Sequence, residues 1–133
     1  MTASTDALAL VRMAARAASD KLASDIVAFD VSEQLVITDA FLICSASNDR
    51  QVVAIVDEIE ERVRRETGTK PARREGDREA RWVLLDYVDV VVHVQHVEER
   101  VYYSLERIWR DCPEIALPLE VTVGSSAGAG ESR

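Results

Sequence analysis

The segment WVLLDYVDVVVHV, residues 82–94, organises the fold that this sequence predicts. Its two apolar runs, 82–86 and 90–94, are typical of strands, and only residues 87–89 separate them. This spacing predicts a hairpin of two antiparallel strands. The turn chemistry is weak, because the β-branched side chain of Val88 disfavours the positive φ that tight hairpin turns use.

Further strands are predicted upstream of this hairpin. Residues 26–31 form a β-branched, strand-like stretch, followed by a polar turn at 32–34 and the apolar residues 35–37. Residues 40–44 are apolar without alternation, which is typical of a strand buried on both faces. A short edge strand fits before Gly76.

Helical periodicity marks three other segments. Apolar residues recur at three- and four-residue steps from residue 8 to residue 22, with Ser4 or Thr5 as the N-cap. A final helix is predicted from residue 98 to residue 109. Strands and helices therefore alternate irregularly, which predicts a single α/β (α+β) domain with a mixed β-sheet flanked by helices.

The remaining predicted helix begins near residue 47 and ends at Gly68. Asn48 and Gln51 have the spacing of a capping box at its start. Its polar face carries three pairs in the favourable i,i+4 order: Glu58→Arg62, Glu60→Arg64 and Glu61→Arg65. Paired charges of this kind are typical of a solvated helix face.

The chain of 133 residues has the length of one domain. We expect residues 1–112 to form it and residues 113–133, rich in Gly, Ser and Ala, to form a flexible C-terminal tail. Two cysteines are too few for a secreted disulfide framework, and no apolar run reaches the ~20 residues that cross a bilayer. The N-terminus lacks the features of a signal peptide. We therefore expect a cytoplasmic protein with no membrane partner.

The 16 basic and 24 acidic side chains give a net charge of -8. Phosphate backbones repel such a chain on average, so we expect no direct, specific binding of nucleic acid and favour a basic protein as partner. Only two of the five glycines, Gly68 and Gly76, lie outside the last ten residues. They cannot build a glycine-rich phosphate loop.

No motif predicts catalysis, a cofactor or a metal site. His93 and His96 are three residues apart, so on a strand their side chains point to opposite faces. Cys44 lies in an apolar strand, where a thiol acts as a small hydrophobe. Four carboxylates could in principle serve two-metal phosphoryl chemistry, but their spacing is poor: Asp30, Asp39, Asp86 and Asp89.

Five of the seven aromatic residues fall between residues 82 and 109, namely Trp82, Tyr87, Tyr102, Tyr103 and Trp109. Three carboxylates lie among them: Asp86, Asp89 and Glu106. Aromatic anchors beside carboxylates are what a binding surface for a basic protein offers. The alternative is that both tryptophans fill the core, and composition alone leaves both interpretations open.

Three segments resemble, in the right order, the signatures of the ribosomal silencing factor (Iojap) family. They are TDAFLICS at 38–45 with Ser47, Asp49, Arg50, Gln51 and Val52, then Gly76 with WVLLDYVDVVVHV, then Arg100, Tyr102, Tyr103, Leu105, Glu106, Ile108 and Trp109. The resemblance spans residues 6 to 112. Val88 stands where the family usually has Gly, and Ala40 where it usually has an aromatic residue or Cys.

This resemblance implies a translation repressor rather than an enzyme. It implies binding to the large ribosomal subunit through large-subunit ribosomal protein number fourteen, which blocks an intersubunit bridge and subunit association. It also implies a nucleotidyltransferase-like fold without the catalytic motif, no cofactor, and a homodimer when free. Trp82, Asp86 and Tyr87 match family positions implicated in gripping the ribosomal protein, and we add Asp89, Tyr103 and Glu106 as candidate contacts.

Two alternatives belong to other functional classes. The first is a nucleotidyltransferase-like enzyme with unrecognised acidic residues, which predicts binding of Mg²⁺ and nucleoside triphosphate. The second is an RNA-binding module that uses the locally basic segment from Lys70 to Arg81, which predicts steeply salt-dependent binding of naked RNA.

Overall fold

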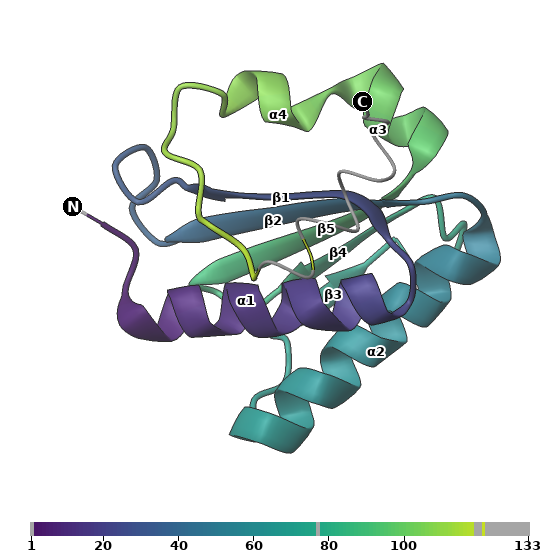
Figure 1. Cartoon of the computed structure of the whole chain (residues 1–133), viewed down its shortest axis with the longest axis horizontal. Helices are drawn as coiled ribbons and strands as arrows, with labels where there is room; N and C mark the ends of the chain where they lie inside the picture. Colours follow the sequence, from purple (N-terminus) through teal and green to yellow (C-terminus); the bar gives the residue numbers. More distant parts are fainter. Residues whose placement is uncertain (1, 77, 119–120, 122–133) are drawn as a thin grey trace.

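The computed structural model describes residues 2–76, 78–118 and 121. In this part of the chain, five strands form one sheet in the order β1-β2-β5-β4-β3 (Figure 1). The strands are β1 (Ser24–Asp30), β2 (Ala40–Ala46), β3 (Arg73–Glu75), β4 (Trp82–Asp86) and β5 (Val90–His96). The helices are α1 (Thr5–Asp20), α2 (Asp49–Thr67), α3 (Val97–Tyr103) and α4 (Leu105–Ile108). Only β2 and β5 pair in parallel, so the sheet is mixed, and the predicted α+β class is confirmed.

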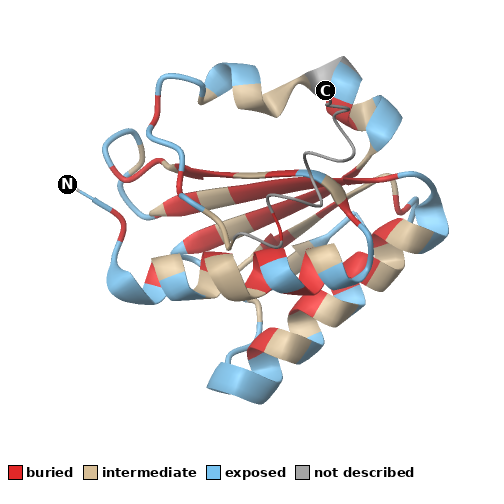
Figure 2. Cartoon of the chain, viewed as in Figure 1, coloured by how far each residue is buried: buried red, intermediate tan, exposed pale blue. Residues whose placement is uncertain are grey.

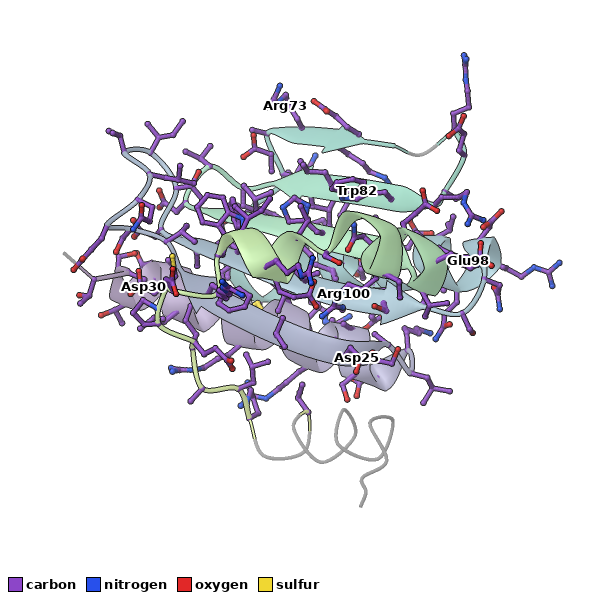
Figure 3. The ribbon with its side chains drawn as sticks, turned by 90° about the horizontal axis from the view of Figure 1, so that it is seen from above. Asp25, Asp30, Arg73, Trp82, Glu98 and Arg100 are labelled. Carbon is purple, nitrogen blue, oxygen red and sulfur yellow. The ribbon has the colours of Figure 1, made fainter. Side chains whose placement is uncertain are left out.

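The sheet lies between two unequal layers of helices (Figure 1). Helices α1 and α2 cover one face, and buried residues gather on them and along the central strands (Figure 2). Helix α1 contributes mostly alanines to this core, among them Ala14, Ala15 and Ala18, which let the helix approach the sheet closely. The shorter helices α3 and α4 lie on the opposite face, where α3 packs on β2 and β5. This second layer leaves β4 and β3 to one side (Figure 3).

The predicted boundaries of α2 are confirmed by its caps. The Asn48 side chain accepts a hydrogen bond from the Gln51 backbone at 2.8 Å, and the Gln51 side chain accepts one from the Ser47 backbone at 2.7 Å. At the other end Gly68 adopts the left-handed conformation with φ of 76°, and its N–H bonds to the carbonyl of Arg64. Both ends of the helix are therefore fixed by local sequence.

The charge pairing on α2 differs in part from the prediction. The Glu58–Arg62 pair forms at 2.7 Å, but Glu60 instead accepts from Arg74 on β3 at 3.1 Å. The Arg64 side chain is left to pair with Glu61 at 2.8 Å. Arg74, which the tertiary fold brings close, thus replaces Arg64 as the partner of Glu60.

The predicted extent of the C-terminal helix is wrong. The helix expected over residues 98–109 is broken at Ser104, whose left-handed backbone (φ 48°, ψ 54°) ends α3 and precedes α4. Part of the expected flexible tail is ordered: Ile115 N–H bonds to the carbonyl of Ala28 at 2.9 Å, and Asp30 N–H bonds to that of Pro113 at 2.8 Å. Residues 113–115 therefore lie along the free edge of β1, whereas residues 122–133 lie outside the described part of the chain.

The hairpin turn between β4 and β5 carries backbone strain at Val88, whose φ is 74°. A β-branched residue in this region costs about 1–3 kcal/mol, and glycine removes that cost. Glycine also loses more backbone entropy on folding, by roughly 0.5–1 kcal/mol. We therefore expect Val88→Gly to raise the free energy of unfolding by about 1 kcal/mol in urea denaturation. A loss of stability would show that the valine side chain makes compensating contacts.

Candidate functional site

The candidate site lies on β4, on the same side of the sheet as α3 and α4, where these two helices leave the strand uncovered. Strand alternation sends Val83 and Leu85 into the core beneath α1 and α2, where both are buried. The other three side chains, those of Trp82, Leu84 and Asp86, point to the opposite face and are half-buried. We call these three residues the β4 outer face; Figure 3 labels Trp82 on β4 and Arg73 on the neighbouring strand β3, where Arg73 pairs with Asp86.

Trp82 is held in a fixed orientation on the β4 outer face. Its indole Nε1–H donates a hydrogen bond to Nδ1 of His93 at 3.2 Å. His93 in turn contacts Phe41 edge to face, with ring centroids 5.3 Å apart, and Phe41 contacts Trp109 in the same way at 5.0 Å. Successive ring contacts thus connect Trp82 through His93 and Phe41 to Trp109, and they restrict the orientation of the Trp82 ring.

Two surface hollows lie on either side of Trp82. One has a volume of about 250 Å³ and is lined by Glu75, Gly76, Trp82 and Leu84. The other has a volume of about 400 Å³ and is lined by Gly76, Arg78, Glu79, Arg81, Trp82 and Glu99. An oriented aromatic ring that lines two hollows, with glutamate and arginine side chains around it, has the form of an anchor for another protein.

Asp86 stabilises the turn that follows β4 while keeping part of its carboxylate accessible. Its Oδ1 accepts a hydrogen bond from the Val88 N–H at 2.8 Å, and its Oδ2 lies 3.2 Å from the guanidinium of Arg73. The side chain is 19% exposed. Asp89, which directly follows the strained residue Val88, is exposed.

The structure separates the other sequence-predicted contacts from Trp82 and Asp86. Tyr87 points into the core beneath α2 and is only 7% exposed, and this burial raises the pKa of its phenol to about 12. Glu106 accepts a hydrogen bond from Nε of buried Arg100 at 2.8 Å, so its charge is used within the fold. The backbone of Tyr103 ends α3, but its side chain lies outside the described part of the structure.

Three residues that shape the site are not among the contacts predicted from the sequence. Leu84 follows from the period-two alternation of β4, which the sequence displays. His93 was considered only as a metal ligand, and its role as acceptor for the Trp82 indole depends on a cross-strand neighbour. Gly76 adopts φ of 97° next to the Trp82 carbonyl, a proximity that no local pattern signals.

His93 predicts an acid-sensitive component of stability. Burial lowers its pKa to about 4, whereas the unfolded chain takes up the proton near its ordinary value of 6.5. The folded state therefore binds fewer protons in this window, and the free energy of unfolding falls as pH drops from about 6.5 to about 4, by roughly 3 kcal/mol in total.

We expect urea denaturation across this pH range to show that loss in the wild-type chain and a much smaller one in His93→Asn. Asparagine is the matched variant because its amide oxygen can still accept the hydrogen bond from the Trp82 indole. Ionisable groups other than His93 contribute equally to both proteins. Parallel stability curves for the two proteins would contradict the assignment.

Three of the five cations in the basic segment between residues 70 and 81 are paired with carboxylates. Arg73 pairs with Asp86 and Glu75, Arg74 pairs with Asp57 and Glu60, and Arg81 pairs with Asp49, Glu98 and Glu99. Guanidinium groups bound to carboxylates are poorly available to phosphates. Nothing in this arrangement favours the RNA-binding alternative.

The carboxylates considered for phosphoryl chemistry serve local backbone groups. Partial burial acts against ionisation of Asp30, but hydrogen bonds from Ser32 and from the Ala3 N–H hold its pKa below the ordinary value. Asp39 accepts from the Ser4 N–H at 2.9 Å. In residues 2–76, 78–118 and 121, no three His, Cys, Asp or Glu side chains are grouped to hold a metal ion. Within the same residues, no helix has the length and apolar character that a membrane span requires.

Comparison with known proteins gives the family. Residues 4–132 match the family model described as ribosomal silencing factor during starvation, RsfS. This chain is a member of the ribosomal silencing factor family. The match continues to residue 132, beyond residue 112, where the resemblance in the sequence motifs ends.

Relatives within the ribosomal silencing factor family include both bacterial and plant proteins. The chain is 47% identical over 104 residues to the ribosomal silencing factor RsfS of Bacillus subtilis, covering 78% of this chain and 87% of the relative. It is 33% identical over 109 residues to the chloroplastic protein Iojap of Zea mays, covering 80% of this chain and 46% of that protein.

Solved structures share the fold. A crystal structure of a Bacillus halodurans protein matches with a TM-score of 0.71 and 42% identity, over 82% of this chain and 98% of that one. A crystal structure of a Chromobacterium violaceum protein matches with a TM-score of 0.74 and 28% identity, over 84% and 93% of the two chains.

Proposed function

We propose that this chain represses translation by binding the large ribosomal subunit through large-subunit ribosomal protein number fourteen. In this proposal the bound protein blocks an intersubunit bridge, so the small subunit cannot join. The chain acts as a steric block and carries out no reaction. Membership of the ribosomal silencing factor family supports this general role, and the β4 outer face supports a protein partner.

The single observation that carries the proposal is that the oriented ring of Trp82 and the carboxylate of Asp86 lie on the same face of β4, at its two ends, where α3 and α4 do not cover the sheet. Ribosomal proteins are rich in Lys and Arg, so a strand face that carries both an aromatic anchor and a carboxylate complements such a surface in both charge and shape. The net charge of -8 favours the same kind of partner and disfavours direct contact with ribosomal RNA.

The proposed contacts divide into two groups. Trp82, Asp86 and Asp89 present accessible atoms and would contact the ribosomal protein directly. Tyr87 and Glu106 would act by holding the supporting structure, because the first is buried under the sheet and the second neutralises Arg100. Tyr103 remains a proposed direct contact.

We also propose that the free protein is a cytoplasmic homodimer. Light scattering of the purified chain at several concentrations measures its mass directly. A monomeric mass at every concentration would remove the dimer from the proposal without affecting the proposed ribosome contact.

The function is tested by a subunit-joining assay on sucrose gradients. Purified small and large subunits are mixed with and without the protein, and its position in the gradient is followed. We expect the protein to travel with the large subunit and the joined peak to decrease. Normal joining, with no protein in the large-subunit fraction, would overturn the proposal. Detectable binding of Mg²⁺ with a nucleoside triphosphate would then direct attention to the enzymatic alternative.

A further inference from the structure

A cluster of exposed apolar side chains lies at the end of the sheet where β2 and β5 begin. Val36 is 98% exposed and Ile37 is 74% exposed, both on the loop between β1 and β2. Val88 is 52% exposed on the turn between β4 and β5. We call these three residues the apolar tip. Single exposed apolar residues are ordinary on a protein surface, so an interaction site needs evidence that the segments carrying them are held together.

Hydrogen bonds join the loop and the turn that carry the apolar tip. The Thr38 hydroxyl donates to the carbonyl of Val88 at 3.2 Å. The N–H groups of Asp39 and Ala40 both donate to the carbonyl of Asp89, at 2.8 and 3.1 Å. Two segments some fifty residues apart are thereby held as one surface.

The base of the loop is also fixed. Val31 is fully buried, its N–H donates to the carbonyl of Asp39, and its own carbonyl accepts from Gln34 and Leu35, each at 2.9 Å. Leu35 packs against the cluster around Phe29. Leu35, the first of the three consecutive apolar residues 35–37, therefore packs against the core. Val36 and Ile37 extend into solvent from a loop whose base is held in place. Such preorganisation lowers the entropy cost of binding.

Backbone strain points in the same direction. Val88 holds a β-branched side chain at φ of 74°, although glycine would satisfy this turn at lower cost. Strained residues gather at functional sites, because the side chain is useful in the conformation that costs free energy. The exposed isopropyl group of Val88 makes this turn apolar as well as acidic.

Charge identifies the kind of occupant. Along the chain, Asp86 at the end of β4 and Asp89 after the turn lie on either side of Val88. Carboxylates therefore border the apolar tip on the side that faces β4 and Trp82. Arg73, on the strand next to β4, is paired with Asp86 and Glu75. An apolar patch edged by carboxylates complements a protein surface in which apolar side chains are edged by Lys or Arg.

We propose that the apolar tip is a second docking point for the same basic ribosomal protein that the β4 outer face binds. This inference rests on the proposed function. It adds to the β4 outer face a second surface, of which Val36 and Ile37 come from the loop between β1 and β2. Trp82 fixes one end of the contact and the apolar tip fixes the other, with Asp86 between them.

The test uses the full-length double variant Val36→Ser/Ile37→Ser and purified large subunits. Both side chains are exposed, so we expect an unchanged unfolding midpoint together with an affinity at least about tenfold weaker. The matched control is Leu22→Ser, an exposed apolar residue (81%) next to the start of β1, which pairs with the far end of β2. We expect Leu22→Ser to bind as the wild type does. Val88→Gly gives an independent arm, because it should stabilise the fold and still weaken binding several-fold.

The outcomes separate this inference from the function on which it rests. If Asp86→Lys loses binding but Val36→Ser/Ile37→Ser binds as the wild type does, the apolar tip is not a docking point, and the proposed function still stands. A double variant that becomes monomeric while retaining its affinity for the subunit assigns the tip to a second copy of the chain, which also overturns it. Failure of the wild-type chain to bind large subunits overturns both.

Discussion

Asp86→Lys is expected to weaken binding of the large subunit at least about a hundredfold, which corresponds to roughly 2.7 kcal/mol. The substitution places a cation where the proposed ribosomal partner presents cations, and like charges in an interface cost several kcal/mol. It also removes the ion pair with Arg73, which then keeps only its pair with Glu75, so the introduced lysine lies near a second cation at the same edge. Co-sedimentation with purified large subunits at fixed salt measures the loss.

Two control variants isolate the charge of Asp86 from its structural role. Asp86→Asn keeps an oxygen that can accept from the Val88 N–H, so it should preserve the turn and weaken binding only about tenfold. Glu66→Lys makes the same change in net charge at an exposed position near the end of α2, and should bind normally. If Asp86→Lys is folded by circular dichroism and binds as the wild type does, the interface lies elsewhere on the molecule.

The parts of the fold that could be predicted are those fixed by local sequence. The caps of α2 depend on residues within four positions of one another, and β4 and β5 depend on apolar runs beside a short turn. The break at Ser104 carries no such signal, because a serine in the left-handed conformation looks like any other helical serine in the sequence. The pairing of residues 113–115 with β1 has no local signal either, because their partners on β1 lie some eighty-five residues earlier.

The candidate site was predictable in type but only partly in membership. Trp82 and Asp86 share a face because they are four residues apart on a strand, whereas Tyr87, one residue further, points into the core. Glu106 has the composition of a contact residue, but the bend at Ser104 brings it to the buried guanidinium of Arg100. Burial and pairing, which depend on the assembled fold, decide which acidic and aromatic residues remain available to a partner.

The loop that supports Trp82 depends on one glycine. Gly76 adopts φ of 97°, and a Cβ atom added there would overlap the carbonyl oxygen of Trp82 and lie 3.0 Å from its carbonyl carbon. Relief of this overlap requires the backbone of β3 or β4 to move, because neither atom belongs to a flexible side chain. Gly68, at φ of 76°, offers the contrast: an added Cβ meets no atom within 4 Å.

We therefore expect Gly76→Ala to lower the free energy of unfolding by about 3 kcal/mol and Gly68→Ala by only about 1 kcal/mol, since both carry the backbone cost but only the first creates a collision. Urea denaturation of the two variants measures the difference. The displaced β4 should also shift the indole resonance of Trp82 and weaken subunit binding in Gly76→Ala, while Gly68→Ala binds normally. Equal losses of stability in the two variants would show that the close approach of Gly76 to Trp82 does not constrain the hairpin.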